Sequence, residues 1–406
     1  MLPALGGCAR RGADAPLRFW AMGREGEVLD ELLAPLRREQ PALQLRVEKL
    51  PWSAAHEKLL TAFAGDATPD IAQLGNTWIA ELAALNALEP LQPWVDAAGL
   101  RAQDHFDAIW RTNQVDGVLY GLPWYIDTRL LFYRTDLFAR AGVGRMPDDW
   151  AGFVRALDAL QASGVAHPLL LPLPEFEPLL ALALQQDEPL LRDGNRFGNF
   201  RGAGFRRALS FYLERFARGH APYLTGNQIA NLWQEFGRGT FAAFISGPWN
   251  IGELDRRLPA AQRSAWSTAP LPGPNGPGAS SAGGASLVIF RGAARKAEAM
   301  RVLTFLSRPE VQLRFHALTG DLPSNRATWA MAPLAGDRRA SAFAQQLERA
   351  KPPPAVPEWE RIAQEMQLFA TRAQRYRTPV DEVAAALDAR VDGFLEKRRW
   401  MLAKAR

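Results

Sequence analysis

The sequence predicts an α/β protein that is built from two domain-sized units. At 406 residues the chain is long enough for two units that each bury a core. Near its start, strand-like and helix-like segments alternate with short links, an order typical of a parallel sheet covered by helices on both faces. The predicted strands span 17–20, 43–47 and 68–74, and the predicted helices span 28–36, 53–63 and 78–88.

Each of these early elements follows from a local pattern. Leu43, Leu45 and Val47 alternate with polar residues, as in a strand with one buried face. Apolar residues at helical spacing mark the helix over 28–36, which Pro35 must bend or end early. Ser53 is a good N-cap for the next helix.

Beyond residue 140 the alternation is interrupted rather than repeated. Residues 150–239 are predicted to be mainly helical. Strands are expected at 241–245 and 283–289, and further helices at 296–306 and 358–404.

Composition narrows the class of function. Hydrophobic residues make up 48% and charged residues 22%, as in globular proteins, so extended disorder is not expected. The net charge of +5 comes from scattered basic residues rather than from a stripe, which argues against nucleic-acid binding. No run approaches the roughly 18 apolar residues of a transmembrane helix. The five His lack metal-ligand spacing, so no metal and no other cofactor is expected.

The single cysteine, Cys8, lies in a short motif of its own. Leu5-Gly-Gly-Cys8 resembles a bacterial lipobox, in which small residues precede a cysteine that receives a lipid. Only seven residues precede Cys8, without a basic or a fully apolar region, which suggests a start codon assigned too late or a trimmed chain. We expect an extracytoplasmic or periplasmic protein, anchored by lipid through Cys8.

The segment 116–140 is the most informative part of the chain for function. After Pro123 it carries Trp124, Tyr125 and the carboxylate of Asp127, and an apolar strand follows. An aromatic pair beside a carboxylate, where one strand layer gives way to the next, suits a polyhydroxylated ligand. Trp124 is expected to pack in the core.

This segment and three other blocks resemble the family 1 extracellular solute-binding proteins, the sugar-capturing subunits of ABC importers. The other blocks are 244–251, Gly283-Gly284 with the following strand, and Thr319-Gly-Asp-Leu-Pro-Ser324. The resemblance implies a two-lobed periplasmic-binding-protein fold, with each lobe a mixed sheet flanked by helices and the ligand in the cleft between the lobes. It places a lipobox and linker at 1–16, lobe I at 17–126 plus 283–325, and lobe II at 127–282 plus 326–406.

Asp127 is the first candidate for ligand binding. A carboxylate accepts two sugar hydroxyls in charge-assisted hydrogen bonds, and the family has an acidic sugar ligand at this position. Tyr125 offers a ring face and a phenol. Trp249, after Gly247-Pro248, matches a family aromatic that stacks on the sugar, although a core position is as plausible. Asn250 either caps the following helix or reaches a hydroxyl.

The remaining candidates come from other parts of the chain. The loop after the first strand and the strand ends supply polar and aromatic groups, and Gly284 allows a close approach of the backbone. Trp359 aligns loosely with a family aromatic that closes the pocket from lobe II. A structural role is the competing interpretation for each, and for a lone His above all. The further candidates are Glu25, Trp52, His56, Asn76 and Trp78.

These residues and the resemblance predict a protein that binds a sugar, expected to be a disaccharide or small oligosaccharide. It would deliver this sugar to ABC permease subunits by hinge closure. The protein is expected to be a monomer and not an enzyme. One alternative is a glycoside hydrolase, in which Asp127 and Glu25 would flank the scissile bond about 5–9 Å apart. The other is the same fold with a non-sugar solute such as a polyamine, a peptide or a metal.

Overall fold

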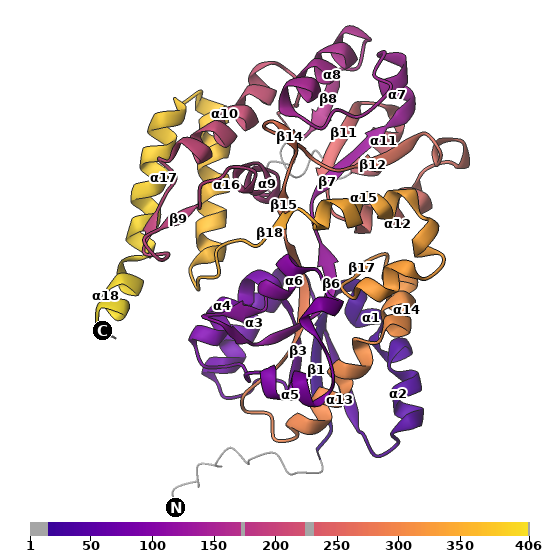
Figure 1. Cartoon of the computed structure of the whole chain (residues 1–406), viewed down its shortest axis with the longest axis vertical. Helices are drawn as coiled ribbons and strands as arrows, with labels where there is room; N and C mark the ends of the chain where they lie inside the picture. The colour runs from indigo at the N-terminus through magenta and orange to yellow at the C-terminus, as the bar shows by residue number, and fades with distance from the viewer. Residues whose placement is uncertain (1–14, 172–174, 224–230, 405–406) are drawn as a thin grey trace, which may run out of the picture.

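The strands of the computed structural model form two main sheets, one in each of two lobes (Figure 1). The structure describes residues 15–171, 175–223 and 231–404. We call the six-stranded sheet and its helices lobe I, and the four-stranded sheet and its helices lobe II. Both sheets are mixed and flanked by helices, so the predicted fold class is confirmed.

The sheet of lobe I has the strand order β17-β6-β16-β3-β1-β2. β1 pairs in parallel with β2 and β3, whereas β16 is antiparallel to β3 and β6, and β17 is antiparallel to β6. The mixed character arises because β16 and β17 return from a distant part of the chain. The strands are β1 (Leu17–Met22), β2 (Leu45–Leu50), β3 (Ile71–Gly75), β6 (Gly121–Asp127), β16 (Gly283–Ile289) and β17 (Leu322–Pro323).

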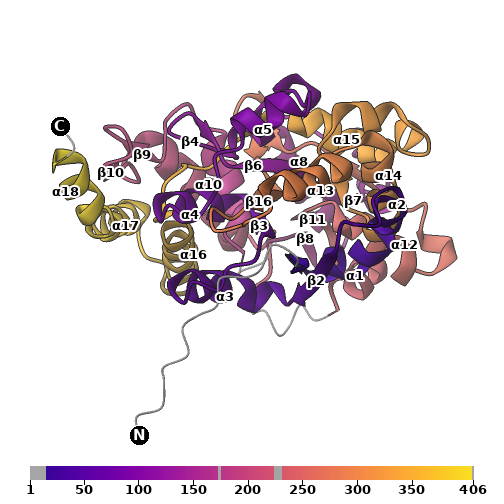
Figure 2. The same cartoon turned by 90° about the horizontal axis from the view of Figure 1, so that it is seen from below.

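Helices cover the lobe I sheet and supply much of its core. Phe19 and Leu29 are fully buried and belong to one cluster with Leu303 and Phe315. Figure 2 shows this layer from below. The helices are α1 (Gly23–Leu32), α2 (Ala34–Glu39), α3 (Trp52–Ala64), α4 (Ile79–Ala84), α5 (Gln92–Ala97), α6 (Asp107–Arg111), α13 (Lys296–Leu306) and α14 (Pro309–Thr319); the short hairpin β4 (Gln114–Val115) and β5 (Val118–Leu119) precedes β6.

The sheet of lobe II has the order β12-β7-β11-β8. β7 is antiparallel to both β11 and β12, and β11 is parallel to β8. Its strands are β7 (Leu130–Arg134), β8 (His167–Leu170), β11 (Phe241–Ser246) and β12 (Trp266–Ala269). Its helices are α7 (Thr135–Arg140), α8 (Trp150–Ala162), α9 (Glu177–Leu184), α10 (Ala203–Ala217), α11 (Leu232–Arg238), α12 (Trp249–Arg257), α15 (Arg338–Leu347), α16 (Trp359–Tyr376), α17 (Val380–Phe394) and α18 (Glu396–Lys404).

The chain passes between the lobes through short connections. Only Thr128 and Arg129 separate β6 of lobe I from β7 of lobe II. A second passage joins β15 (Ser280–Ser281), which pairs with β18 (Ala350–Lys351), to β16. The third follows β17. The lobe limits predicted from the sequence stay a prediction, although the strands of the two sheets fall on either side of them.

The helix predicted over 28–36 ends early, which is one of the two effects expected of Pro35. α1 ends at Leu32, and Pro35 lies in the first turn of a separate helix, α2, which begins at Ala34. The start of the next helix needs correction. The helix that was expected to begin after Ser53 begins at Trp52, and Pro51 occupies its N-cap without a side-chain bond. Proline at this position needs no donor and is already set for the extended N-cap backbone.

Candidate functional site

A cleft of about 810 Å³ receives side chains from both lobes. Six of the predicted ligand-binding residues line it, namely Glu25, Trp52, Tyr125, Asp127, Trp249 and Gly284. The other lining residues are Arg24, Gly75, Leu318, Thr319 and Asp321 in lobe I, and Arg129, Glu177, Glu253 and Arg256 at the lobe II side. A ligand in this cleft would contact both lobes at once.

On the lobe I side, a chain of hydrogen bonds fixes Tyr125 and Glu25. The backbone N–H of Met22 donates to Gln73 Oε1 at 2.7 Å, which turns the Gln73 amide so that Nε2 donates to the Tyr125 oxygen at 3.2 Å. The Tyr125 hydroxyl then donates to Glu25 Oε1 at 2.6 Å. Because Gln73 is fully buried, this chain holds the phenol and the carboxylate rigidly at the cleft.

Two carboxyl groups on this side, those of Glu25 and Asp321, have no ion-pair partner within the described ranges. Burial raises the pKa of Glu25, and the hydrogen bond from Tyr125 opposes this rise. Burial, followed by the charge of Glu25, raises the pKa of Asp321 well above its ordinary value. The pair therefore accepts a proton more readily than two exposed carboxylates would.

On the opposite side, Arg129 joins two carboxylates. Its Nη1 lies 3.3 Å from Asp127 Oδ2, and its Nη2 lies 2.7 Å from Glu177 Oε1. Burial alone would lower the pKa of Arg129, but the charges of Asp127 and Glu177 raise it, so the guanidinium stays charged. Burial raises the pKa of Asp127, the charge of Arg129 lowers it, and Glu177 raises it again.

Trp249 lies over Arg129 at the edge of the cleft. The guanidinium carbon is 4.7 Å from the centroid of the indole ring. A Cβ on Gly247 would lie 2.0 Å from that ring and 2.6 Å from Asp127 Oδ1, so only glycine lets the ring fold back beside the carboxylate. Trp249 is the first residue of α12 after Pro248 and keeps part of its surface open to the cleft.

Gly284 adopts φ +124° where β16 pairs with β6, next to a shift of register between Ala285 and Ser286. A Cβ there would lie 2.2 Å from the carbonyl oxygen of Tyr125. The sequence predicted that Gly284 allows a close approach of the backbone to a ligand. In the structure, the group that approaches Gly284 closely is the backbone of the neighbouring strand β6. The irregular pairing lies where β6, which carries Tyr125 and Asp127, reaches the cleft.

Five predicted ligand-binding residues do not line the cleft, and three of these, Asn76, Asn250 and Trp359, are buried in the protein. Asn76 is buried, where it donates to Thr112 at 2.9 Å and accepts from Ser286 at 2.8 Å. Asn250 lies inside the first turn of α12, where it donates to Ser246 at 2.8 Å and accepts from Trp233 at 2.8 Å. These amides have protein partners in place of a ligand.

Trp359 is the third of these residues. Its side chain is 1% exposed and belongs to the main apolar cluster of lobe II. It therefore packs in the core and does not close the pocket. The next residue, Glu360, is the one that reaches lobe I, because the Thr77 hydroxyl donates to its carboxylate.

His56 and Trp78 flank the cleft and do not line it. His56 Nε2 lies 2.7 Å from Glu81 Oε2, and the hydrogen bond to Glu81 raises the pKa of His56. The His56 ring is 5.0 Å from that of Trp78, which in turn contacts Trp52 edge-on at 5.6 Å. Since Trp52 is 37% exposed, the cluster presents an indole to the cleft.

The sequence analysis missed several lining residues. Arg129 and Asp321 lie within the blocks 116–140 and 319–324 that carried the resemblance, so their position gave a usable signal. Glu177, Glu253 and Arg256 lie on α9 and α12, and nothing in their local sequence separates them from surface charges.

Three further results concern other predictions. In the part of the chain that the structure describes, no helix is both long and apolar enough to cross a membrane. Within those same ranges, no three His, Cys, Asp or Glu side chains are grouped so that they could hold a metal ion. Cys8 lies outside the described residues, and its lipidation stays a prediction.

Comparisons with known proteins identify the family. Residues 22–313 match the family model described as bacterial extracellular solute-binding protein. The structure of the sugar-binding protein MalE from Xanthomonas citri is 49% identical with a TM-score of 0.93, and the match covers 96% of this chain and 99% of that one.

More distant proteins share the same fold. The GacH receptor of Streptomyces glaucescens, with structures unliganded and in complex with acarbose, is 21% identical with a TM-score of 0.82, over 94% of this chain and 98% of that one. The diacetylchitobiose binding protein DasA of Streptomyces coelicolor is 23% identical over 96% of this chain and 92% of its own length. This chain belongs to the bacterial extracellular solute-binding protein family.

Proposed function

We propose that the protein binds a carbohydrate, such as a disaccharide or small oligosaccharide, in the cleft between its lobes and delivers it to an ABC permease. The observation that carries this proposal is the pairing of aromatic faces with carboxylates across the cleft. Trp52, Tyr125 and Trp249 line the same cleft as Glu25, Asp127 and Asp321. The rings offer apolar surface to the C–H faces of a sugar, and the carboxylates accept hydrogen bonds from its hydroxyl groups.

Similarity supports the same ligand class. The protein from Xanthomonas citri, which shares 49% identity over nearly all of both chains, is a sugar-binding protein. The distant relatives concern saccharide-like ligands as well: DasA is a diacetylchitobiose binding protein, and the GacH receptor has a structure in complex with acarbose.

Transport follows from the two lobes and the short links between them. Closure around a ligand needs hinges that absorb backbone rotation, and Thr128 with Arg129 forms one such link. The closed form would dock on permease subunits at the outer face of the cytoplasmic membrane, held there by a lipid on Cys8. The Thr77–Glu360 hydrogen bond already joins the two lobes in this structure, beside the links between them.

Binding without chemistry is the simplest use of these carboxylates. Each has protein partners that hold it in the cleft, and Asp127 is committed to Arg129. A glycoside hydrolase would need one carboxyl group as an acid and a second as a nucleophile or base. The raised pKa of Glu25 would suit an acid, so the experiment includes that outcome.

The test is a thermal-shift screen of purified protein against a panel of mono- and disaccharides, followed by calorimetry on each sugar that stabilises it. At 100 times Kd, a ligand adds about 2.7 kcal/mol of stability. Small-angle scattering should show a smaller radius of gyration with the bound sugar, and chromatography should recover that sugar unchanged. Cleaved product, lost when Glu25 becomes Gln, would favour the hydrolase. Stabilisation by no saccharide but by a polyamine or peptide would overturn the proposed ligand class.

A further inference from the structure

The last described helix, α18, exposes three consecutive apolar side chains. Trp400 is 58% exposed, Met401 46% and Leu402 38%. Among the described residues, every other exposed large hydrophobic stands alone in the sequence. Figure 1 shows α18 at the lower end of α17, at the side of the molecule and away from the two sheets. Three exposed apolar neighbours are a surface that solvation alone does not explain.

Basic side chains surround this apolar group. Lys397 and Lys404 lie on α18 and are exposed, and the Lys404 ammonium nitrogen is 3.8 Å from the centroid of the Trp400 ring. The neighbouring hairpin, β9 (Leu191–Arg192) and β10 (Phe197–Gly198), adds further charge. The charges of α18, of the hairpin and of the α17 residues beside it are Arg192, Arg196, Lys397, Arg398, Arg399 and Lys404 against Asp193, Asp388, Asp392 and Glu396.

α18 is attached to lobe II and is not a loose tail. Arg399 Nη1 donates to the carbonyl oxygen of Arg196 at 3.0 Å, and its guanidinium carbon lies 4.7 Å from the centroid of the Phe197 ring. The Arg399 N–H donates to the carbonyl of Leu395, which is fully buried. The views of Figures 1 and 2 both place α18 beside the β9–β10 hairpin. The cations and the exposed apolar residues therefore form one preformed surface.

We propose that α18 and the adjoining hairpin dock on the surface of a bilayer that contains anionic phospholipids. Consecutive helix residues are about 100° apart, so Trp400, Met401 and Leu402 spread over roughly 200° of the helix surface. On the same spacing Lys397 and Lys404 fall within this arc, so cations and apolar side chains share one side of the helix. Such a mixture suits the polar headgroup level of a bilayer better than the dry groove of a partner protein. Trp suits the headgroup level, and the surrounding cations match the lipid charge.

The proposal is independent of the ligand in the cleft. At nine residues, α18 is far too short to span a bilayer, so the expected mode is surface binding. Docking there would orient lobe II toward the membrane at its C-terminal side. A failure to bind sugar would leave this inference untouched, and the reverse also holds.

The experiment measures flotation of the full chain with lipid vesicles, with Cys8→Ser in every protein so that lipid attachment contributes nothing. One set of vesicles contains phosphatidylcholine alone, and the other contains phosphatidylcholine with phosphatidylglycerol. We expect binding to the anionic vesicles only, and weaker binding as salt is raised. The triple change of Trp400, Met401 and Leu402 to Ser should lower the partition coefficient at least about tenfold.

The double variant Lys397→Gln/Lys404→Gln should lower it by a similar factor and flatten the salt dependence. Tyr376→Ser is the control, because Tyr376 is 68% exposed at the end of α16 and lies outside this surface. Equal melting temperatures would show that the variants fold. Three outcomes would overturn the proposal: no binding of the wild type to anionic vesicles, equal binding to neutral ones, or a concentration-dependent dimer that the triple variant abolishes, which would identify a second copy as the occupant.

Discussion

Two polar clusters near lobe II are built from the same kinds of side chain but differ in how completely their atoms are paired. One is the cleft cluster, in which Arg129 joins Asp127 and Glu177. The other, the His220 cluster, lies between α8 and the end of α10 and joins His220 to Asp158, Arg215 and Arg218. The comparison separates a cluster that stabilises the fold from one that is available to a ligand.

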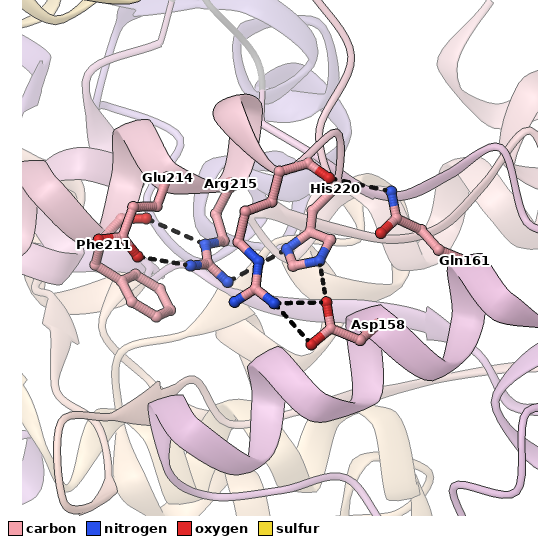
Figure 3. Close-up of polar contacts among 7 residues, drawn as sticks. Asp158, Gln161, Phe211, Glu214, Arg215 and His220 are labelled. Carbon is pink, nitrogen blue, oxygen red and sulfur yellow. Dashed lines mark hydrogen bonds and ion pairs between the residues drawn. The ribbon is translucent and has the colours of Figure 1, made fainter.

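In the His220 cluster, both ring nitrogens have partners (Figure 3). His220 Nε2 lies 2.8 Å from Asp158 Oδ1, and Nδ1 lies 3.3 Å from Arg215 Nη1. Since a guanidinium can only donate, Nδ1 accepts and Nε2 carries the proton, so the ring is neutral. Arg215 also donates to the carbonyl oxygen of Phe211 at 3.2 Å. This cluster lies away from the cleft and ties α8 to α10.

In the cleft cluster the pairing is incomplete. Arg129 Nε is buried without a hydrogen-bond partner among the described residues, and Nη1 is 3.3–3.4 Å from the oxygens of Asp127. Such an unmet donor costs free energy that a ligand oxygen or an ordered water could recover. Incomplete pairing beside an aromatic face is what distinguishes a ligand site from a structural ion pair.

Removing Arg129 should have the largest effect of the changes considered. Arg129→Leu leaves Asp127 and Glu177 close together without their shared cation, and breaking a buried pair costs about 3 kcal/mol of folding stability. We also expect saccharide affinity to fall more than about 100-fold, because the Trp249 ring loses the cation beneath it. Urea unfolding and calorimetry measure the two effects.

The double variant Arg129→Leu/Asp127→Asn is the matched control. It removes one of the two uncompensated charges, so stability should recover in part while affinity stays low. Arg129→Lys should keep most of the folding stability, but a single ammonium group should lose the simultaneous contact with Asp127 and Glu177. If Arg129→Leu were as stable as the wild type, Arg129 would not be the cation that compensates Asp127 and Glu177.

The second prediction concerns Asp127 alone. Asp127→Asn keeps the shape but loses the charge that accepts ligand hydroxyls, so affinity should fall by about 1.5–3 kcal/mol. The melting temperature without sugar should change little, because Glu177 still pairs with Arg129. Calorimetry with the best sugar of the screen measures the loss. Wild-type affinity for every sugar would show that the carboxylate serves only Arg129.

The cleft residues that could be predicted lie where the backbone itself sets the position. Tyr125 and Asp127 end a strand at the link between the lobes, and Gly284 lies opposite them on the paired strand. Their local sequence therefore indicated both where the strand ends and which side chains could bind a ligand there. Trp249 follows a Gly-Pro pair that fixes its direction in the same way.

The residues that could not be predicted depend on packing between distant segments. Trp359 and Glu360 are neighbours on α16, yet the first packs in the lobe II core and the second reaches Thr77 in lobe I. Which of the two points toward lobe I is decided by how α16 packs on lobe II. Likewise Asn76 is paired by Thr112 and Ser286, which come from two remote parts of the chain.

A third prediction tests how Trp249 is held. In Gly247→Ala the new Cβ would collide with the indole ring and with Asp127 Oδ1, so the ring must leave its place over Arg129. We expect a loss of about 1–2 kcal/mol in saccharide affinity, close to that of Trp249→Ala, since both remove the stacking face. Gly144→Ala is the control, because a Cβ there would meet nothing within 4 Å. A steep fall in melting temperature for Trp249→Ala with intact affinity would make Trp249 a core residue.

The smallest effect is expected in the His220 cluster and depends on pH. Burial, the largest cause, lowers the pKa of His220, Asp158 raises it, and the charge of Arg215 lowers it again. A histidine with a lowered folded pKa adds stability above its unfolded value of about 6.5, and loses that contribution as pH falls toward the folded value.

His220→Gln should therefore be less stable than the wild type by about 1–2 kcal/mol at pH 7.5, because one hydrogen bond is lost. That gap should narrow at pH 5.0, because the unfolded wild type then binds a proton at His220, whereas burial and the contact with Arg215 disfavour this proton in the folded protein. Urea unfolding at both pH values measures the gap, and the other titrating groups, including His105, are present in both proteins and cancel in the difference. Saccharide affinity should stay the same in the variant, because the cluster lies away from the cleft. A gap that widens on acidification would mean that His220 is charged in the folded protein, and a loss of affinity would mean that the two clusters are coupled.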